Sequence, residues 1–397
     1  MHKKQSCVYQ QLVANSCPDI HLIIKNNEVI IMCKKLLSLA LALCVCLTIT
    51  STAIAHDGSD QRKSSGAIST THLEPEMEYL KLQILNNHGI TIVPSDAYYL
   101  ADTSGNDTYC CVEFTYANGG VGFGVIDLTD YTIMIYSLDT NPPFSKHDEI
   151  VCAGAFNYAI IDRRTNTATV IESDIVVAVD ELYDSSRDNL ITLDSFERTR
   201  IIEELFYAAP SSTILAVGDV VISGGSDTTL VYSAGNNSGT WSTDCGINAI
   251  AMYLRHMAKY FGSGYVPSTH NTESKLKIAL AEIANKNWKT TTSISMARLA
   301  TLANDYMKAH STGSVNVSNS SYTWTKLKNR IDNGNGKPCV LYIGAGATSY
   351  WTKAHAVLGV GYTSGATASS GSIKVNSGWV SLGYVYVATS IPGNIIC

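Results

Sequence analysis

The order of helical and strand-like segments in the second half of the chain constrains its fold more than any other feature. An amphipathic helix is predicted to begin at Asp244, because apolar residues recur at helical spacing from Ile247 to Met257. Three more helical patterns follow it, at about 272–286, 295–309 and 324–333. Strand patterns come only afterwards, at 338–343, 355–361, 372–375 and 383–387. Helices followed by a sheet predict an α+β domain.

The first half of the chain has a different pattern, with one helix ahead of several short strands. A short amphipathic helix is predicted at 75–89, and strand-like runs separated by turns follow it. A second amphipathic helix spans about 195–207, and Pro210 comes after it. We therefore place a domain boundary near Pro210, which separates a small α+β region at 56–210 from a domain at 211–397.

The first 55 residues have the features of a leader. Met32 is followed by a basic pair, a short apolar stretch at 36–49, and the small-x-small sequence Ala53-Ile54-Ala55. This pattern is typical of a secretory signal peptide rather than of a membrane span. We predict that translation starts at Met32, that 1–55 is leader and signal peptide, and that the exported precursor begins near His56. The product is expected to be secreted or held at the cell surface.

The charge of the chain argues against two classes of partner. The leader carries five lysines and two acidic residues, so the rest of the chain holds 23 basic and 32 acidic residues, a formal charge of −9. Such a balance lacks the basic footprint of proteins that bind nucleic acid or anionic membranes. We expect neither nucleic acid nor, after signal removal, a membrane as a partner.

Six of the eleven cysteines lie beyond the leader: Cys110, Cys111, Cys152, Cys245, Cys339 and Cys397. They lack the dense, regular spacing of a disulfide framework, and the sequence leaves open whether Cys339 pairs with Cys397. The chain contains no CxxC or HExxH pattern. We therefore expect no metal site and no cofactor.

Cys245 is the candidate nucleophile, because it stands at the predicted start of the helix that follows Asp244. A thiol there meets the positive end of the helix dipole and unpaired backbone N–H groups, which favour the thiolate. The Asp244 carboxylate, a suitable N-cap, opposes this effect. A reactive Cys245 therefore needs a cationic partner, which predicts a histidine elsewhere in the chain.

His355 is the best placed of the ten histidines to be that partner. His270 and His310 lie in polar, loop-like sequence, and six others fall in the leader or the first half. His256 lies on the helix of Cys245 itself, eleven residues along and hence about 16 Å away. Small residues flank His355, and an apolar strand pattern fixes its position.

An imidazole that takes a proton through one nitrogen needs an acceptor at the other, since otherwise its tautomer and orientation drift. Asn376 lies 21 residues after His355, at the end of a predicted strand. We predict that its amide oxygen receives the N–H of His355.

These segments together resemble the papain-like cysteine peptidase superfamily, and most closely its bacteriocin-leader peptidases and streptopain-like secreted peptidases. The resemblance covers about 150 residues, from Trp241 to the end of the sequence. It rests on the order and local context of Thr243-Asp244-Cys245-Gly246-Ile247-Asn248-Ala249, Gly336-Lys337-Pro338-Cys339-Val340-Leu341, His355-Ala356-Val357, Val360-Gly361-Tyr362 and Val375-Asn376-Ser377-Gly378-Trp379.

The resemblance implies a papain-like catalytic domain, in which a helix bearing Cys245 precedes an antiparallel sheet bearing His355 and Asn376. It also implies that Trp379 shields the histidine and asparagine. The separation of nucleophile and base, 110 residues, is shorter than the usual 130–150. The family's oxyanion glutamine would fall on Gly239, and Asn237 is the nearest amide.

The sequence thus predicts a secreted cysteine endopeptidase with a Cys-His-Asn triad, acting on protein or peptide substrates through a thioester. Residues 56–210 are expected to be a pro-region that contacts the catalytic domain, or else an accessory domain. Three other functions are compatible with parts of this pattern. They are an NlpC-type cell-wall hydrolase, which usually has Ser where this chain has Gly246, a non-catalytic binding protein on the same fold, and a transporter's leader-peptidase domain. The last is disfavoured because the chain has no nucleotide-binding Gly-x-x-x-x-Gly-Lys-Ser/Thr motif.

Overall fold

The computed structural model describes residues 73–171, 175–183, 218–232, 245–289, 294–311, 316–332, 336–343, 355–379 and 381–397. All of them belong to one compact unit, Ala67–Cys397. The leader at 1–55, the predicted helix at 195–207 and the predicted boundary at Pro210 lie outside the described residues. The division into 56–210 and 211–397 therefore stays a prediction. None of the helices in the described ranges is long and apolar enough to cross a membrane.

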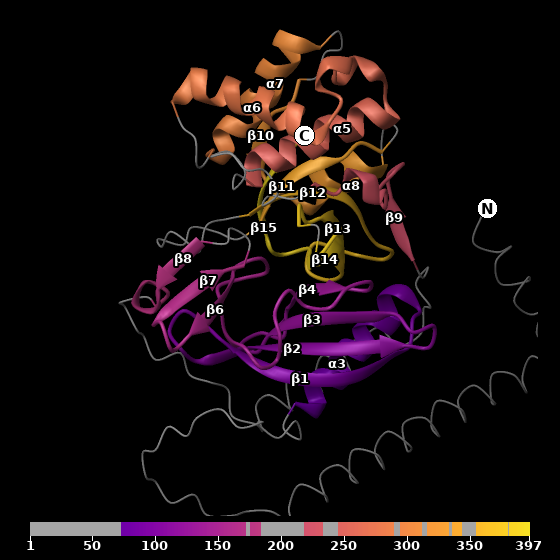
Figure 1. The fold of residues 1–397 in the computed structure, drawn as a ribbon. Helices are drawn as coiled ribbons and strands as arrows, with labels where there is room; N and C mark the ends of the chain where they lie inside the picture. The colour runs from indigo at the N-terminus through magenta and orange to yellow at the C-terminus, as the bar shows by residue number, and fades with distance from the viewer. Residues whose placement is uncertain are drawn as a thin grey trace, which may run out of the picture. The chain divides into compact units, whose positions relative to one another are not determined.

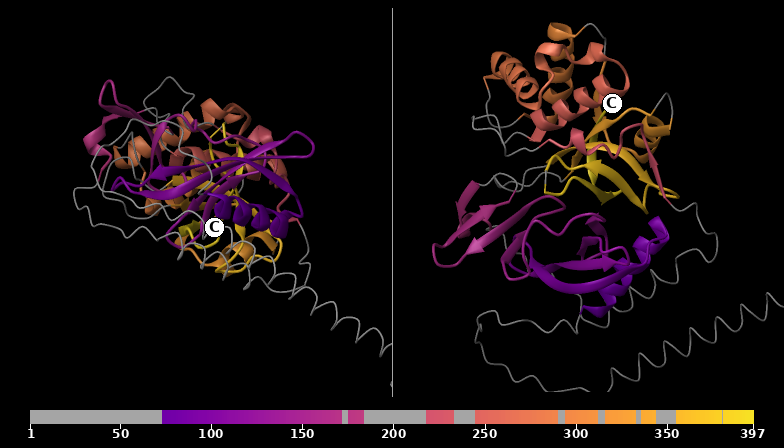
Figure 2. Two further views of the ribbon diagram at one scale, coloured as in Figure 1. Left: turned by 90° about the horizontal axis from the view of Figure 1, so that it is seen from below. Right: turned by 45° about the vertical axis from the view of Figure 1, so that its right-hand side comes forward.

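Helix α3 (Glu74–His88) opens the described chain and confirms the helix predicted at 75–89. It ends at Gly89, whose φ of 67° lies in the left-handed region and whose N–H donates to the Leu85 carbonyl at 2.8 Å. The helix packs against β1 and β2 (Figure 2). Its Leu80 and Ile84 side chains are fully buried.

Eight strands follow α3 in two antiparallel runs. The first run is β1 (Ile92–Ala101), β2 (Asp107–Tyr116), β3 (Val121–Asp127) and β4 (Ile133–Ser137). The second is β5 (Glu149–Cys152), β6 (Tyr158–Asp162), β7 (Thr167–Val170) and β8 (Ile175–Ala178). A single parallel pairing of Ala101 with Val151 joins β1 to β5, so the sheet is mixed.

The second half of the described chain contributes four helices and seven strands. The helices are α5 (Cys245–Tyr260), α6 (Glu273–Trp288), α7 (Met296–His310) and α8 (Trp324–Asp332). The strands are β9 (Asp219–Val221), β10 (Asn319–Ser321), β11 (Cys339–Ile343), β12 (His355–Thr363), β13 (Ser372–Asn376), β14 (Tyr384–Ala388) and β15 (Pro392–Ile396). Short 3-10 turns occur at Val179–Glu181, Thr228–Leu230, Ser263–Tyr265 and Ser268–His270.

Helices α5, α6 and α7 pack together, and α5 also packs against β12 (Figure 1). Apolar residues at helical spacing make this contact possible, since Ile250, Leu254 and Met257 of α5 are at most 1% exposed. Full burial of each such side chain contributes about 1.5–3 kcal/mol, so the position of α5 on the sheet is well determined.

The predicted fold class is wrong. The described residues form one mixed, mostly β structure of 15 strands with few helices, in the order β10-β15-β11-β12-β13-β14-β4-β3-β2-β1-β5-β6-β7-β8, with β9 paired to β12. An α+β arrangement with a self-contained papain-like helix-then-sheet domain is not what the described residues adopt.

The strands of the two halves form one sheet because a single pair of strands joins them. Strand β14 pairs with β4, with Tyr386 opposite Tyr136 and Val387 opposite Ile135. Each of these strands would otherwise present a row of unpaired backbone N–H and C=O groups at a sheet edge. The two predicted sheets therefore merge, which the pattern within each half could not reveal.

Candidate active site

The candidate nucleophile Cys245 is the first residue of α5 and is partly exposed, whereas the residues that follow it in the first turn are buried. Apolar side chains pull the rest of the helix into the core, so Cys245 stands where the helix meets the surface. First-turn backbone N–H groups have no partner within a helix, and a thiolate there is stabilised by them. Asp244 and Asn237 lie outside the described residues.

The candidate base His355 begins β12, a strand in which every residue is buried. It stands opposite Ile343 of β11 in an antiparallel register, and its own exposure is 1%. Because α5 packs against β12, the helix that begins at Cys245 and the strand that begins at His355 are direct neighbours.

A backbone carbonyl orients the His355 ring. Its Nε2 lies 2.8 Å from the carbonyl oxygen of Ser377. A carbonyl can only accept a hydrogen bond, so Nε2 carries the proton, and the lone pair of the neutral ring is on Nδ1. The Ser377 carbonyl therefore accepts the N–H of His355, the role that was predicted for the amide oxygen of Asn376.

The predicted hydrogen bond from His355 to Asn376 is wrong. Asn376 is fully buried, and its Nδ2 donates to the Leu230 carbonyl at 3.0 Å, while its Oδ1 accepts from the Gly378 N–H at 3.2 Å. The register explains this outcome, because Asn376 stands opposite Leu358, three residues along β12 from His355. Side chains alternate between the faces of a strand, so Asn376 and His355 project to opposite faces.

Asn248 joins the helix of Cys245 to the turn that orients His355. It lies on α5, is 2% exposed, and donates from Nδ2 to the carbonyls of Tyr232 at 3.0 Å and Gly378 at 3.1 Å. Gly378 follows Ser377 directly. Its φ of 76° and an Asn248 Nδ2 atom only 2.7 Å from where a Cβ would stand require glycine there.

Two aromatic rings enclose the His355 imidazole. Trp379 lies edge-on to it, with ring centroids 5.8 Å apart, and Phe156 lies 4.9 Å from it at a tilt of 38°. Phe156 also contacts Trp379 at 5.9 Å. It comes from the short connection between β5 and β6, where Gly154 has a φ of 130° and accepts a hydrogen bond from the Asn157 N–H. The first half of the chain therefore contributes a side chain to the candidate site.

The histidines set aside from the sequence lie elsewhere. His256 is buried in the core against Tyr260 and Phe261, and burial lowers its pKa to about 4. His270 and His310 contact each other, with ring centroids 4.8 Å apart, beside Tyr306. Among the residues described, no group of three or more His, Cys, Asp or Glu side chains could hold a metal.

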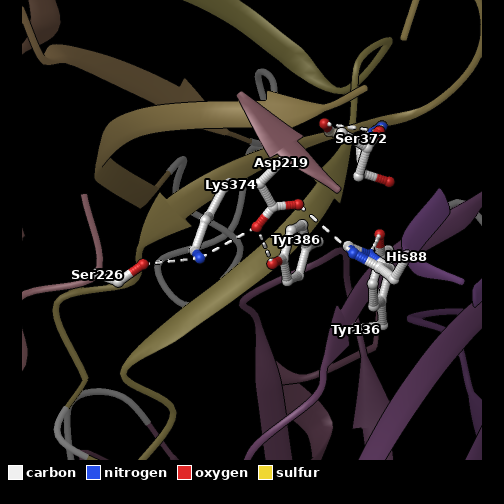
Figure 3. Close-up of polar contacts among 8 residues, drawn as sticks. His88, Tyr136, Asp219, Ser226, Ser372, Lys374 and Tyr386 are labelled. Atoms are coloured by element: carbon white, nitrogen blue, oxygen red, sulfur yellow. Dashed lines mark hydrogen bonds and ion pairs between the residues drawn. The ribbon is translucent and has the colours of Figure 1, made fainter. Parts of the chain in front are cut away.

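A second polar cluster links the two halves of the described chain (Figure 3). Asp219 of β9 accepts from the Tyr386 hydroxyl at 2.5 Å and from Lys374 Nζ at 3.1 Å, and His88 Nδ1 lies 3.5 Å from it. His88 Nε2 in turn lies 2.8 Å from the Tyr136 hydroxyl. Burial is the main cause that lowers the pKa of His88. Because the cluster joins side chains from both halves of the described chain, we interpret it as a structural link between α3, β4 and the β9-β13-β14 region.

Comparison with known proteins adds no family assignment. No protein-family model matches the chain, and no curated protein shows significant similarity to it. The case for function therefore rests on the residues themselves.

Proposed function

We propose that this protein is a cysteine peptidase made as an exported precursor, with Cys245 as nucleophile and His355 as general base. One connection carries the proposal: Asn248, in the first turns of the Cys245 helix, holds the Gly378 carbonyl, and the adjacent Ser377 carbonyl holds the His355 imidazole. The helix that carries Cys245 and the ring of His355 are thus both held by the buried turn at Ser377 and Gly378, and nucleophilic catalysis requires such fixed positions of nucleophile and base.

The chemistry follows from the protonation state of His355. With Nε2–H committed to the Ser377 carbonyl, Nδ1 is the nitrogen that exchanges protons. The Cys245 thiolate attacks the peptide carbonyl carbon, and protonated His355 gives its proton to the leaving amine, which leaves a thioester. Water then attacks the thioester as His355 accepts a proton, and the thiolate is restored. The backbone N–H of Cys245 is suited to receive the oxyanion, and Asn376 serves to hold the turn at 376–379.

The position of Phe156 supports the precursor part of the proposal. A ring from the first half of the chain lies against the candidate base and against Trp379. We infer that this ring restricts access to His355 until the first half of the chain is displaced or removed. We propose that 56–210 is an inhibitory pro-region, that 1–55 directs export, and that a protein or peptide is the substrate.

The test compares casein hydrolysis by the full chain with that of Cys245→Ala and His355→Ala, after incubation long enough for self-processing. Both variants are expected to be inactive, because each removes a group that takes part in bond making. His310→Ala, whose ring lies beside His270 rather than His355, is the matched histidine control and should retain activity. Casein hydrolysis that survives Cys245→Ala would contradict the proposal. Hydrolysis of peptidoglycan but not casein would favour a cell-wall hydrolase.

A further inference from the structure

Cys339 and Cys397 face each other across the pairing of β11 with β15. Val340 stands opposite Ile396 in this antiparallel pair, so the next step of the same register aligns Cys339 with Cys397. Both residues carry free thiols in the structure. Cys339 is fully buried, and Cys397 is partly exposed.

The backbone of Cys397 shows which kind of cross-strand pair this is. Its N–H donates to the Ser318 carbonyl at 3.3 Å, and its carbonyl accepts from the Ser318 N–H at 3.0 Å, on the β10 side. In an antiparallel sheet the N–H and C=O of one residue point to the same neighbour. Cys397 and Cys339 are therefore a non-hydrogen-bonded pair, for which the Cα atoms lie about 4.5 Å apart. That spacing falls within the range that a disulfide spans.

The two sulfurs also differ in reactivity. A hydrogen bond from the Cys339 thiol lowers the pKa of Cys397; burial opposes this effect, and the positive charges of Arg330 and Lys326 lower the pKa further. The same hydrogen bond and burial raise the pKa of Cys339. Cys397 is thus the accessible sulfur that ionises first, and Cys339 is the sheltered one beside it.

We propose that Cys339 and Cys397 form a disulfide that fastens β15 to β11, with a small-molecule disulfide such as oxidised glutathione as the oxidant. The Cys397 thiolate attacks one sulfur of the oxidant, whose S–S bond breaks and releases one glutathione thiolate. The Cys339 thiol loses its proton to solvent and its sulfur attacks the Cys397 sulfur, which releases the second glutathione thiolate. Two protein thiols are oxidised, and one disulfide is reduced to two thiols.

The bond would close a loop that contains β12 and β13, and with them His355 and Asn376. Strand β15 lies between β10 and β11, so its loss would uncover the edge of β11. Cys110 and Cys111, by contrast, stand opposite Tyr99 and Tyr98 of β1, so neither of them faces another cysteine across this strand pair. The proposal does not depend on peptidase activity.

The experiment uses the full chain with Cys245→Ala, so that the thiol of the candidate site does not react. The reduced protein is equilibrated under native conditions in a glutathione redox buffer, quenched in acid, denatured, alkylated and digested for mass spectrometry. A linked peptide pair joining Cys339 to Cys397 is expected, with Cys111 and Cys152 recovered alkylated as internal controls. Recovery of Cys339 and Cys397 as alkylated thiols would overturn the proposal.

A thermal measurement on the same protein gives a second readout. Oxidation should raise Tm by about 5 °C, because the bond constrains a long loop in the unfolded chain. Cys397→Ser changes a partly exposed residue and should remove this shift. An equal shift on oxidation in Cys397→Ser would show that other cysteines are responsible and would overturn the assignment.

Discussion

The hydrogen bonds of Asn248 offer the most specific test of how the candidate site is held together. In Asn248→Ala the carbonyls of Tyr232 and Gly378 lose the donor that reaches them at 3.0 and 3.1 Å. Both residues are buried, so the carbonyls have little access to water. A buried polar group left without a partner costs about 1–3 kcal/mol, so two such carbonyls predict a loss of about 2–6 kcal/mol.

The assay is urea unfolding at 25 °C, followed by tryptophan fluorescence in a Cys245→Ala background that prevents self-cleavage. Asn248→Asp keeps the size of the side chain but cannot donate, so it should lose at least as much stability as Asn248→Ala. Asn287→Ala is the matched control, because its amide donates to Asp305 at an exposed position, and it should change the free energy of unfolding by less than about 1 kcal/mol. Equal losses for Asn248→Ala and Asn287→Ala would refute the reasoning.

Two further predictions concern the contacts between the halves of the chain. Phe156→Ala should speed the reaction of the unprocessed protein with a thiol-directed epoxide, because the ring that lies against His355 is removed. The same change should lower the free energy of unfolding by about 3 kcal/mol. An unchanged labelling rate would contradict the role given to the Phe156 ring. Burial lowers the pKa of His88 below 6.5 although Asp219 opposes it. The folded chain therefore takes up a proton less readily than the unfolded chain, and the free energy of unfolding should fall as pH drops below about 6.5. His88→Gln should flatten this pH dependence, the exposed His147→Gln should not, and identical profiles for wild type and His88→Gln would contradict the assignment.

Local elements near the candidate site could be predicted from the sequence because their patterns are strong. Helix α5 begins at Cys245, one residue after the predicted Asp244, and β12 begins at His355 as expected. Apolar spacing fixes both elements, since each has a buried face that only one secondary structure can provide. The merging of the two sheets at β4 and β14 could not be predicted, because hydrophobic periodicity does not specify which edges pair.

The residues that contact and orient His355 could not be predicted from the sequence for related reasons. The assignment of Asn376 failed on the alternation of faces, which depends on the register of β13 against β12. The sequence did contain one indication of the role of Asn248. It is a polar residue among the apolar residues from Ile247 to Ala251, and a buried polar side chain needs hydrogen-bond partners. The sequence contained no indication of the contact between Phe156 and His355, because these residues lie about 200 positions apart in the chain.

The most direct test of the central claim is the site at which a thiol-directed epoxide reacts with the processed protein. Peptide mass spectrometry should find one adduct, on Cys245, formed fast in wild type and far more slowly in His355→Ala, because the base that promotes the thiolate is absent. Both proteins carry Cys397→Ser, because Cys397 is partly exposed; Cys110, Cys111, Cys152 and Cys339 are buried and should react only after denaturation. An adduct on any other cysteine, or labelling of Cys245 at the same rate with and without His355, would contradict the account.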